Sequence, residues 1–161
     1  MKKIHYIRCD DRLIHGQVIY KWLDHLKRTR VIIVDDEVAN DAMEKRLFQL
    51  TIPKTLDFHI EDRHSFIASA DLVTEALVLC KNLETVVALK HAGFFIDQLL
   101  IGRIPAGLDR KKAEKNIYLS AAELTILDEL LESGTTISAQ TVPDDQKIMI
   151  SERMNRYYEL F

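Results

Sequence analysis

The chain has 161 residues and a formal net charge of −3 at pH 7, so it can bury a substantial core but lacks the basic surplus typical of nucleic-acid-binding proteins. Hydrophobic residues make up 47% of it, yet no apolar run approaches the roughly 18 residues of a membrane span. The amino terminus is too poor in apolar residues for a signal peptide. These features predict a single cytosolic domain over residues 1–161.

Short β-branched apolar segments recur along the chain. They are continuous rather than strictly alternating, which is typical of parallel strands buried on both faces of a sheet. We predict strands over residues 4–9, 31–35, 57–60, 76–80, 98–102 and 135–140.

Helical patterns separate these strands, so the sequence predicts a single-domain α/β fold with a mostly parallel, doubly wound sheet flanked by helices. The first two predicted helices are 18–26, which has one apolar stripe, and 40–50, which has Met43, Leu47 and Leu50 inward. Asp62 caps a third helix that runs to about Ala70, and Asn82 caps a fourth that ends at Gly93, with Leu83, Val86 and Val87 inward.

A capping box of Ser120 and Glu123 begins the fifth predicted helix, which ends at Gly134 and buries Leu124, Leu127, Leu130 and Leu131. A short helix is predicted after Ser151.

Ligands of such sheets bind beyond the carboxyl ends of the strands, which here selects the loops 10–16, 35–40, 80–82 and 102–107. No glycine-rich nucleotide-binding pattern follows any predicted strand. The first loop belongs instead to the highly charged segment RCDDRLIHGQVIYKW, residues 8–22.

His15 stands out in this segment because it precedes Gly16 at the start of a predicted helix, where unpaired backbone N–H groups are expected. A neutral imidazole nitrogen can attack phosphorus, and nearby cations favour the neutral ring. Arg8, Arg12 and the helix N–H groups would then hold the phosphoryl group. Gly16 would let the backbone approach closely, and a neighbouring carboxylate from Asp10-Asp11 would orient the ring or fix an arginine.

Other functions use the same residues. Asp10, Asp11 and His15 are a candidate metal site, although the intervening arginines make it electrostatically poor. An aspartate pair after the first strand is also typical of phospho-aspartate receiver domains. However, Asp57 begins the predicted third strand instead of ending it, and Arg103 stands where a receiver needs a lysine. A ligand-binding α/β domain without covalent chemistry is the third alternative.

The only two cysteines, Cys9 and Cys80, each end a predicted strand. We expect both to be buried free thiols with a packing role, and neither has His or Cys partners at zinc-ligand spacing.

The segment RCDDRLIHGQV, residues 8–18, closely resembles the active-site segment of the IIB components of the mannose/fructose/sorbose class of the sugar phosphotransferase system (PTS). The likeness continues through Trp22, through VIIVDDEVAND at 31–41 and to VPDD at 142–145, so it covers essentially the whole chain.

This resemblance implies that His15 accepts a phosphoryl group on Nδ1 from a phosphohistidine of the IIA component. It then passes the group to a sugar bound by the IIC/IID membrane permease, with no cofactor or metal. Arg8, Arg12, Gly16 and Gln17 match the family's phosphate-binding positions, and Asp10 also matches the pattern. The protein would be cytoplasmic and associated with the inner face of the membrane through the permease.

The sequence departs from the family pattern at a few positions. Lys81 replaces a frequent hydroxyl residue and is a candidate phosphate ligand, while Arg103 interrupts a frequent glycine pair. Cys9 stands where an aliphatic residue is more usual, a change that indicates packing. The basic run Arg110-Lys111-Lys112 with Lys115 is either solvated or faces an acidic partner. The sugar and the oligomeric state are not predicted.

Overall fold

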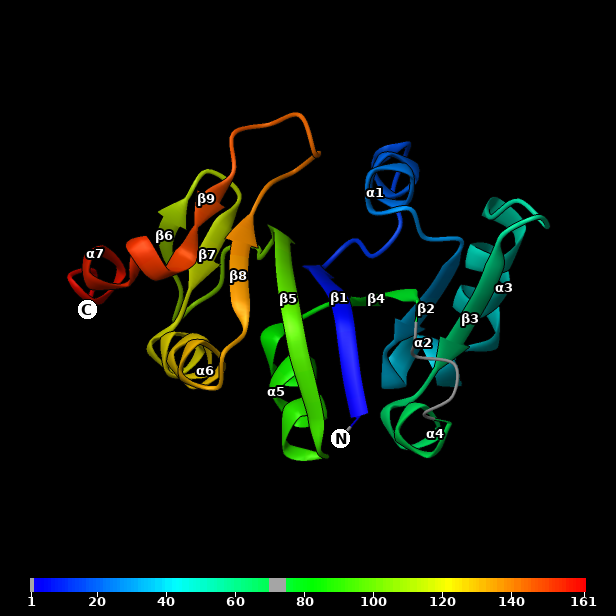
Figure 1. Ribbon diagram of the computed structural model, residues 1–161, viewed down its shortest axis with the longest axis horizontal. Helices are drawn as coiled ribbons and strands as arrows, with labels where there is room; N and C mark the ends of the chain where they lie inside the picture. Colours follow the sequence, from blue (N-terminus) through cyan, green and yellow to red (C-terminus); the bar gives the residue numbers. More distant parts are fainter. Residues whose placement is uncertain (1, 70–74) are drawn as a thin grey trace.

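The computed structural model describes residues 2–69 and 75–161. Its main strands are β1 (Lys2–Asp10), β2 (Arg30–Val34), β3 (Asp57–Glu61), β4 (Ala76–Cys80), β5 (Phe94–Arg103), β8 (Thr136–Ala139) and β9 (Ile148–Met149). They form a seven-stranded sheet in the order β3-β2-β4-β1-β5-β8-β9 (Figure 1). All neighbouring strands are parallel except β9, which is antiparallel to β8. The predicted α/β class is confirmed.

Helices cover both faces of this sheet. They are α1 (Val18–Leu26), α2 (Asp36–Asn40), α3 (Ala42–Thr51), α4 (Arg63–Ala68), α5 (Leu83–His91), α6 (Ala121–Glu132) and α7 (Met154–Tyr158). Side chains of α4 to α7 share one core with Ile32 and Val34, whereas side chains of α1 to α3 share a second core with Val31 and Ile33. Alternate residues of one strand therefore enter opposite cores, which is why the strands read as continuous apolar runs.

The predicted helix caps are confirmed. The Asp62 carboxylate accepts the Ser65 N–H at 2.7 Å, and the Asn82 side chain accepts the Thr85 N–H at 2.9 Å. Ser120 and Glu123 form the reciprocal capping box, with both hydrogen bonds at 3.1 Å. Ala70, the predicted end of the Asp62 helix, lies outside the described residues.

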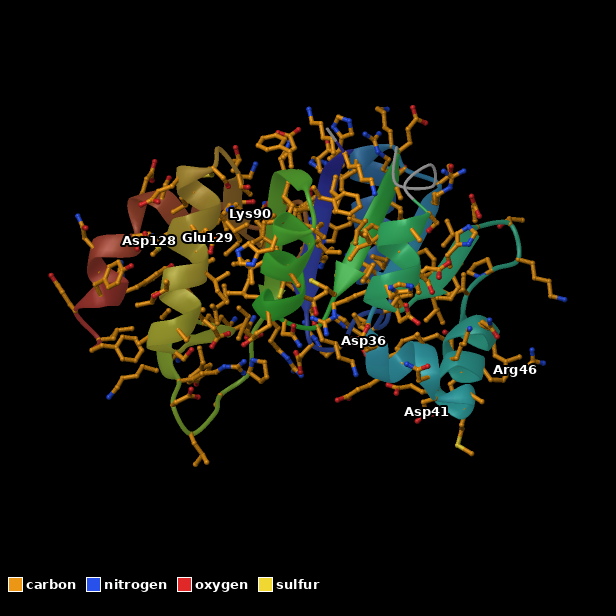
Figure 2. The ribbon with its side chains drawn as sticks, turned by 90° about the horizontal axis from the view of Figure 1, so that it is seen from below. Asp36, Asp41, Arg46, Lys90, Asp128 and Glu129 are labelled. Carbon is orange, nitrogen blue, oxygen red and sulfur yellow. The ribbon has the colours of Figure 1, made fainter. Side chains whose placement is uncertain are left out.

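The predicted helix over 40–50 is wrong in two respects. Asp41 ends α2 and caps α3 by accepting the N–H groups of Met43 and Glu44, so two helices replace one (Figure 2). Met43, Leu47 and Leu50, predicted to point inward, are 75%, 57% and 65% exposed, and Phe48 packs against the core instead. Their spacing indicates a helix, but it does not indicate which face is buried. The predicted core residues Val87 and Leu131 are only half-buried.

A small antiparallel hairpin of β6 (Lys111–Glu114) and β7 (Ile117–Leu119) was not predicted, because it is short and rich in lysine. The basic run lies at its start. Nε of Arg110 donates a hydrogen bond to Oε1 of Glu123 at 2.9 Å, whereas Lys111 and Lys112 are exposed.

Helices α5 and α6 lie side by side, and Lys90 of α5 donates to Glu129 of α6 at 2.8 Å (Figure 2). None of the helices in residues 2–69 and 75–161 has the length and apolar character needed to cross a bilayer.

The carboxyl ends of β1, β5 and β8 point toward the same side of the molecule, at the top of Figure 1. Helix α1 and the loop that follows β8 flank this edge. The charged segment at residues 8–22 therefore lies where ligands of parallel sheets bind.

Candidate functional site

The loop over residues 11–17 connects β1 to α1 and carries His15. Leu13 adopts a left-handed conformation with φ of 59°, yet its side chain is only 2% exposed and belongs to the core under α1. Gly16 is also left-handed, with φ of 53°, and a Cβ atom there would meet nothing within 4 Å. The buried side chain of Leu13 therefore anchors the loop to the core, while the space around Gly16 is open.

The imidazole of His15 faces Asp10. Its Nε2 atom lies 3.5 Å from Oδ2 of Asp10, is buried and has no hydrogen-bond partner. The side chain as a whole is 27% exposed. Since Nε2 is covered, the exposure of the ring comes from its other atoms.

Asp10 is almost fully buried at 1% exposure and binds Arg12 through both oxygens. Its Oδ1 accepts the backbone N–H and the Nε–H of Arg12, each at 3.0 Å, and its Oδ2 accepts Nη2 at 2.9 Å. Burial alone would raise the pKa of Asp10, but the hydrogen bonds and charge of Arg12, together with the charge of Arg8, lower it below its usual value. Asp10 is therefore a carboxylate at neutral pH.

The pKa of His15 is lowered from its usual value of 6.5, first by burial and then by the positive charge of Arg12, while Asp10 acts in the opposite direction. The ring is therefore neutral at pH 7, which is the form that can attack an electrophile.

Arg8, predicted to bind phosphate, is 1% exposed and directs its guanidinium to the loop after β8. Nη1 donates to the carbonyl of Gln140 and Nη2 to that of Thr141, each at 3.1 Å. Nη2 also lies 3.5 Å from Oδ2 of Asp10. Burial lowers the pKa of Arg8 to about 10, so it remains a cation at neutral pH. These contacts tie β1 to the loop after β8, and the phosphate contact of Arg8 stays a prediction.

Gly102 makes room for this buried ion pair at the end of β5. A Cβ atom at this position would lie 2.2 Å from Nη2 of Arg8 and 2.6 Å from Oδ2 of Asp10. Sequence reasoning missed this requirement. The available signal was the glycine itself, placed at the carboxyl end of a strand beside the charged loop.

Asp11 and Arg103 form a second bidentate pair, with Nε and Nη2 of Arg103 donating to the carboxylate at 2.7 and 2.9 Å. Asp11 thus contacts Arg103, and no contact joins it to His15, so the structure favours Asp10 as the carboxylate that faces the ring. Within the part of the chain that the structure describes, no group of three or more His, Cys, Asp or Glu side chains is placed to hold a metal ion.

Lys81 is not brought together with His15. Its Nζ lies 3.8 Å from Oε1 of Glu44 on α3, and it lines a cavity of about 260 Å³ with Asp35 and Asn82. This placement does not support the predicted phosphate contact.

Gln17 occupies the N-cap position of α1, but its side chain forms no capping hydrogen bond. Helices α2 to α6, by contrast, are all capped by an Asp, Asn or Ser side chain. The first-turn N–H groups of α1 therefore have no side-chain acceptor from Gln17, next to His15 in the sequence.

Cys9 and Cys80 are neighbours on β1 and β4 and are both 0% exposed, which confirms the prediction of buried free thiols. A hydrogen bond with Cys80, together with burial, raises the pKa of Cys9 well above its usual value. The Cys9 thiol is thus protonated, and both cysteines belong to the core that includes side chains of α4 to α7.

Comparison with known proteins agrees with this architecture. The family described as PTS system sorbose subfamily IIB component matches residues 4–158. The N-acetylgalactosamine-specific phosphotransferase enzyme IIB component 1 of Escherichia coli is 28% identical over 149 residues, covering 90% of this chain and 94% of the relative. The sorbose-specific EIIB component of Lacticaseibacillus casei is 28% identical over 155 residues, covering 94% of each chain.

Among solved structures, the IIBSor domain of the sorbose permease from Klebsiella pneumoniae superposes with a TM-score of 0.86 at 26% identity, covering 97% of this chain and 98% of that domain. The family match, the relatives and the shared fold extend over nearly the entire chain and include the loop that carries His15. The chain therefore belongs to the sorbose subfamily of PTS IIB components and is a phosphotransferase subunit of a sugar PTS.

Proposed function

We propose that His15 is the phosphoryl acceptor and donor of this IIB component. The observation that carries the proposal is a neutral, partly exposed imidazole whose Nε2 is covered and faces the Asp10 carboxylate at 3.5 Å. With Nε2 covered, Nδ1 is the ring nitrogen left to react.

The transfer is a displacement at phosphorus between two imidazoles. The Nδ1 lone pair of His15 attacks phosphorus while the N–P bond of the incoming phosphohistidine breaks, and the donor ring leaves with that electron pair. The proton on Nε2 of His15 stays in place, so the phosphorylated ring carries a positive charge. In the second step a sugar hydroxyl oxygen bonds to phosphorus while the N–P bond of His15 breaks. The ring leaves neutral with its Nε2 proton, and the hydroxyl proton passes to solvent.

Asp10 stabilises the positive ring that forms in this step. Its carboxylate is ionised and lies next to Nε2, so it favours the tautomer with the proton on Nε2 and offsets the developing charge. A slight approach of the ring would turn the 3.5 Å contact into a charge-assisted hydrogen bond.

Arg12 and the amino end of α1 hold the phosphoryl group. Arg12 is 29% exposed, and its bidentate contact with Asp10 uses Nε and Nη2 and leaves Nη1 for an anion. A phosphoryl dianion recruits such a guanidinium strongly. The N–H groups of α1 that lack a side-chain cap favour an anion at the same end.

The phosphoryl donor in this proposal is the phosphohistidine of a IIA component, and the acceptor is a sugar held by the IIC/IID permease at the inner face of the membrane. Support comes from membership of the IIB family and from the open outer side of the loop at Gly16, where two different partners must each reach one nitrogen. The two relatives at 28% identity are named for different sugars, so their names do not select one for this chain.

The decisive experiment is the intact mass of the protein after incubation with phosphoenolpyruvate, the general PTS phosphocarriers and a IIA component, before and after mild acid. We expect one added phosphate that acid removes and alkali preserves. His15→Ala, folded by circular dichroism, should acquire none.

Other outcomes point elsewhere. A phosphate on the His15→Ala variant that alkali cleaves would indicate an acyl phosphate and hence a receiver-like module. No added mass from a donor mixture that phosphorylates another IIB component of this family would leave only the non-covalent ligand-binding alternative.

A further inference from the structure

The carbonyl oxygen of Thr141 accepts hydrogen bonds from two elements that flank the site. Nη2 of Arg8 on β1 donates to it at 3.1 Å, and the indole Nε1 of Trp22 on α1 donates at 2.9 Å. The guanidinium carbon of Arg8 also lies 5.2 Å from the centre of the Trp22 ring. A carbonyl oxygen has two lone pairs, so these two donors use its full capacity.

The loop that carries His15 runs between these two anchors. One end leaves β1, which Arg8 ties to Thr141, and the other end enters α1, which Trp22 ties to the same oxygen. A shift of α1 relative to β1 would change the distance spanned by residues 11–17 and, with it, the approach of His15 to Asp10.

Gln140, the residue before Thr141, is held in place by its own hydrogen bonds. The Gln140 N–H donates to the carbonyl of Ile101 on β5 at 3.1 Å, and the Gln140 side chain donates to the carbonyls of Pro143 and Asp145 at 3.1 and 2.7 Å. The loop after β8 is therefore attached to β5, and both β1 and α1 are hydrogen-bonded to this loop at Thr141.

We infer that Trp22 is a positioning residue for phosphoryl transfer at His15 and acts through Thr141 and Arg8. The inference rests on the proposed role of His15. Trp22 is 2% exposed, so it touches neither the phosphoryl donor nor the sugar. Its contribution must appear in the rate within the complex and not in affinity, because transfer depends on the placement of the reacting atoms.

The test is the kinetics of transfer from phosphorylated IIA at varied IIA concentration. Trp22→Phe retains an aromatic ring over Arg8 but loses the N–H donor. Loss of one such hydrogen bond predicts a fall of about three- to tenfold in the rate at saturating IIA, with an unchanged KM. Trp22→Leu also loses the ring and should be slower still.

Phe66→Leu supplies the matched control. Phe66 is 1% exposed, lies on α4 and packs against Phe94 in the core of the opposite sheet face. We expect Phe66→Leu to lower the Tm at least as much as Trp22→Phe while leaving the transfer rate unchanged.

Wild-type kinetics for Trp22→Phe would overturn the inference, as would a change in KM alone or an equal loss of rate in Phe66→Leu. A wild-type protein that never gains a phosphate would instead overturn the proposed function, and the role of Trp22 would fall with it.

Discussion

Nε2 of His15 lies 3.5 Å from Oδ2 of Asp10 and is buried without a hydrogen-bond partner, although both oxygens of that carboxylate are bound by Arg12. Arg12 and His15 thus face the same carboxylate, which is hydrogen-bonded to Arg12 alone of the two. In the proposed reaction Arg12 keeps its contact with Asp10, and a slight approach of the ring lets Nε2–H donate to Oδ2 of the same carboxylate. The contact at His15 is therefore poised to shorten when the site is loaded.

The first prediction concerns the pKa of His15, which lies below 6.5 in the folded protein because of burial and the charge of Arg12. The transfer rate should be constant near pH 7 and fall only at pH values below 6.5. Arg12→Gln should raise the pKa of His15. Nuclear magnetic resonance titration of the imidazole protons measures both values, with Arg103→Gln as a control whose charge does not contribute to the His15 shift.

The same shift affects stability. In the interval between the folded pKa of His15 and its usual value of 6.5, the unfolded chain binds more protons than the folded one. The free energy of unfolding should therefore increase with pH across this interval and lose the contribution of His15 as the pH falls. A folded-state midpoint at or above 6.5 would contradict both statements.

The second prediction compares two adjacent aspartates. Asp10→Asn leaves the buried cation of Arg8 without its carboxylate and should lower the free energy of unfolding by about 3 kcal/mol. It should also lower the pKa of His15 further, because Asp10 raises it. Asp11→Asn breaks the partly exposed pair with Arg103 and should cost no more than about 1 kcal/mol.

Urea unfolding and His15 titration of both variants check this comparison. Equal effects of the two substitutions on the His15 pKa would show that Asp10 is not the carboxylate that faces the ring.

The third prediction concerns Gly102, where a Cβ atom would overlap both Arg8 and Asp10. Gly102→Ala should destabilise the fold by about 1–3 kcal/mol through overpacking and should slow phosphorylation of His15. Gly107→Ala is the control, because the atoms nearest to its Cβ would be side-chain carbons of Arg110, the first at 3.3 Å. Urea unfolding and the phosphorylation rate are the measurements, and equal behaviour of the two variants would contradict the steric argument.

The fourth prediction tests the orientation of α3. Leu47 is 57% exposed, so Leu47→Gln should change the free energy of unfolding by less than about 0.5 kcal/mol. Leu127 of α6 is 0% exposed, and Leu127→Ala should cost about 2–5 kcal/mol. A large loss for Leu47→Gln in urea unfolding would mean that the exposed face of α3 is covered in solution.

Much of this fold is predictable from sequence because its signals are local. Continuous apolar runs mark strands buried on two sides, and caps such as Asp62 and Asn82 show where helices begin. The orientation of α3 was not predictable, because the spacing of Met43, Leu47 and Leu50 fits any face of a helix. The β6–β7 hairpin was missed because its pairing depends on contacts between strands, not on an apolar pattern.

The candidate site shows the same division. The charged loop and His15 follow from residue types and from resemblance, but the partners of its arginines do not. Arg8 and Arg103 both lie next to the charged loops, but the sequence does not indicate which groups they contact. The structure separates them, because Arg8 turns inward to backbone carbonyls of a loop more than a hundred residues away, whereas Arg103 binds Asp11. Such long-range pairing leaves no trace in local sequence.

The left-handed backbone at Leu13 has a consequence for engineering and for divergence within the family. A non-glycine residue in this conformation is disfavoured on its own, so the burial of the Leu13 side chain under α1 must offset the cost. The shape of the loop thus depends on core residues outside the loop, among them Ile19, Trp22 and Leu23 of α1. Grafting residues 8–18 onto another parallel sheet would transfer the reactive group without its geometry.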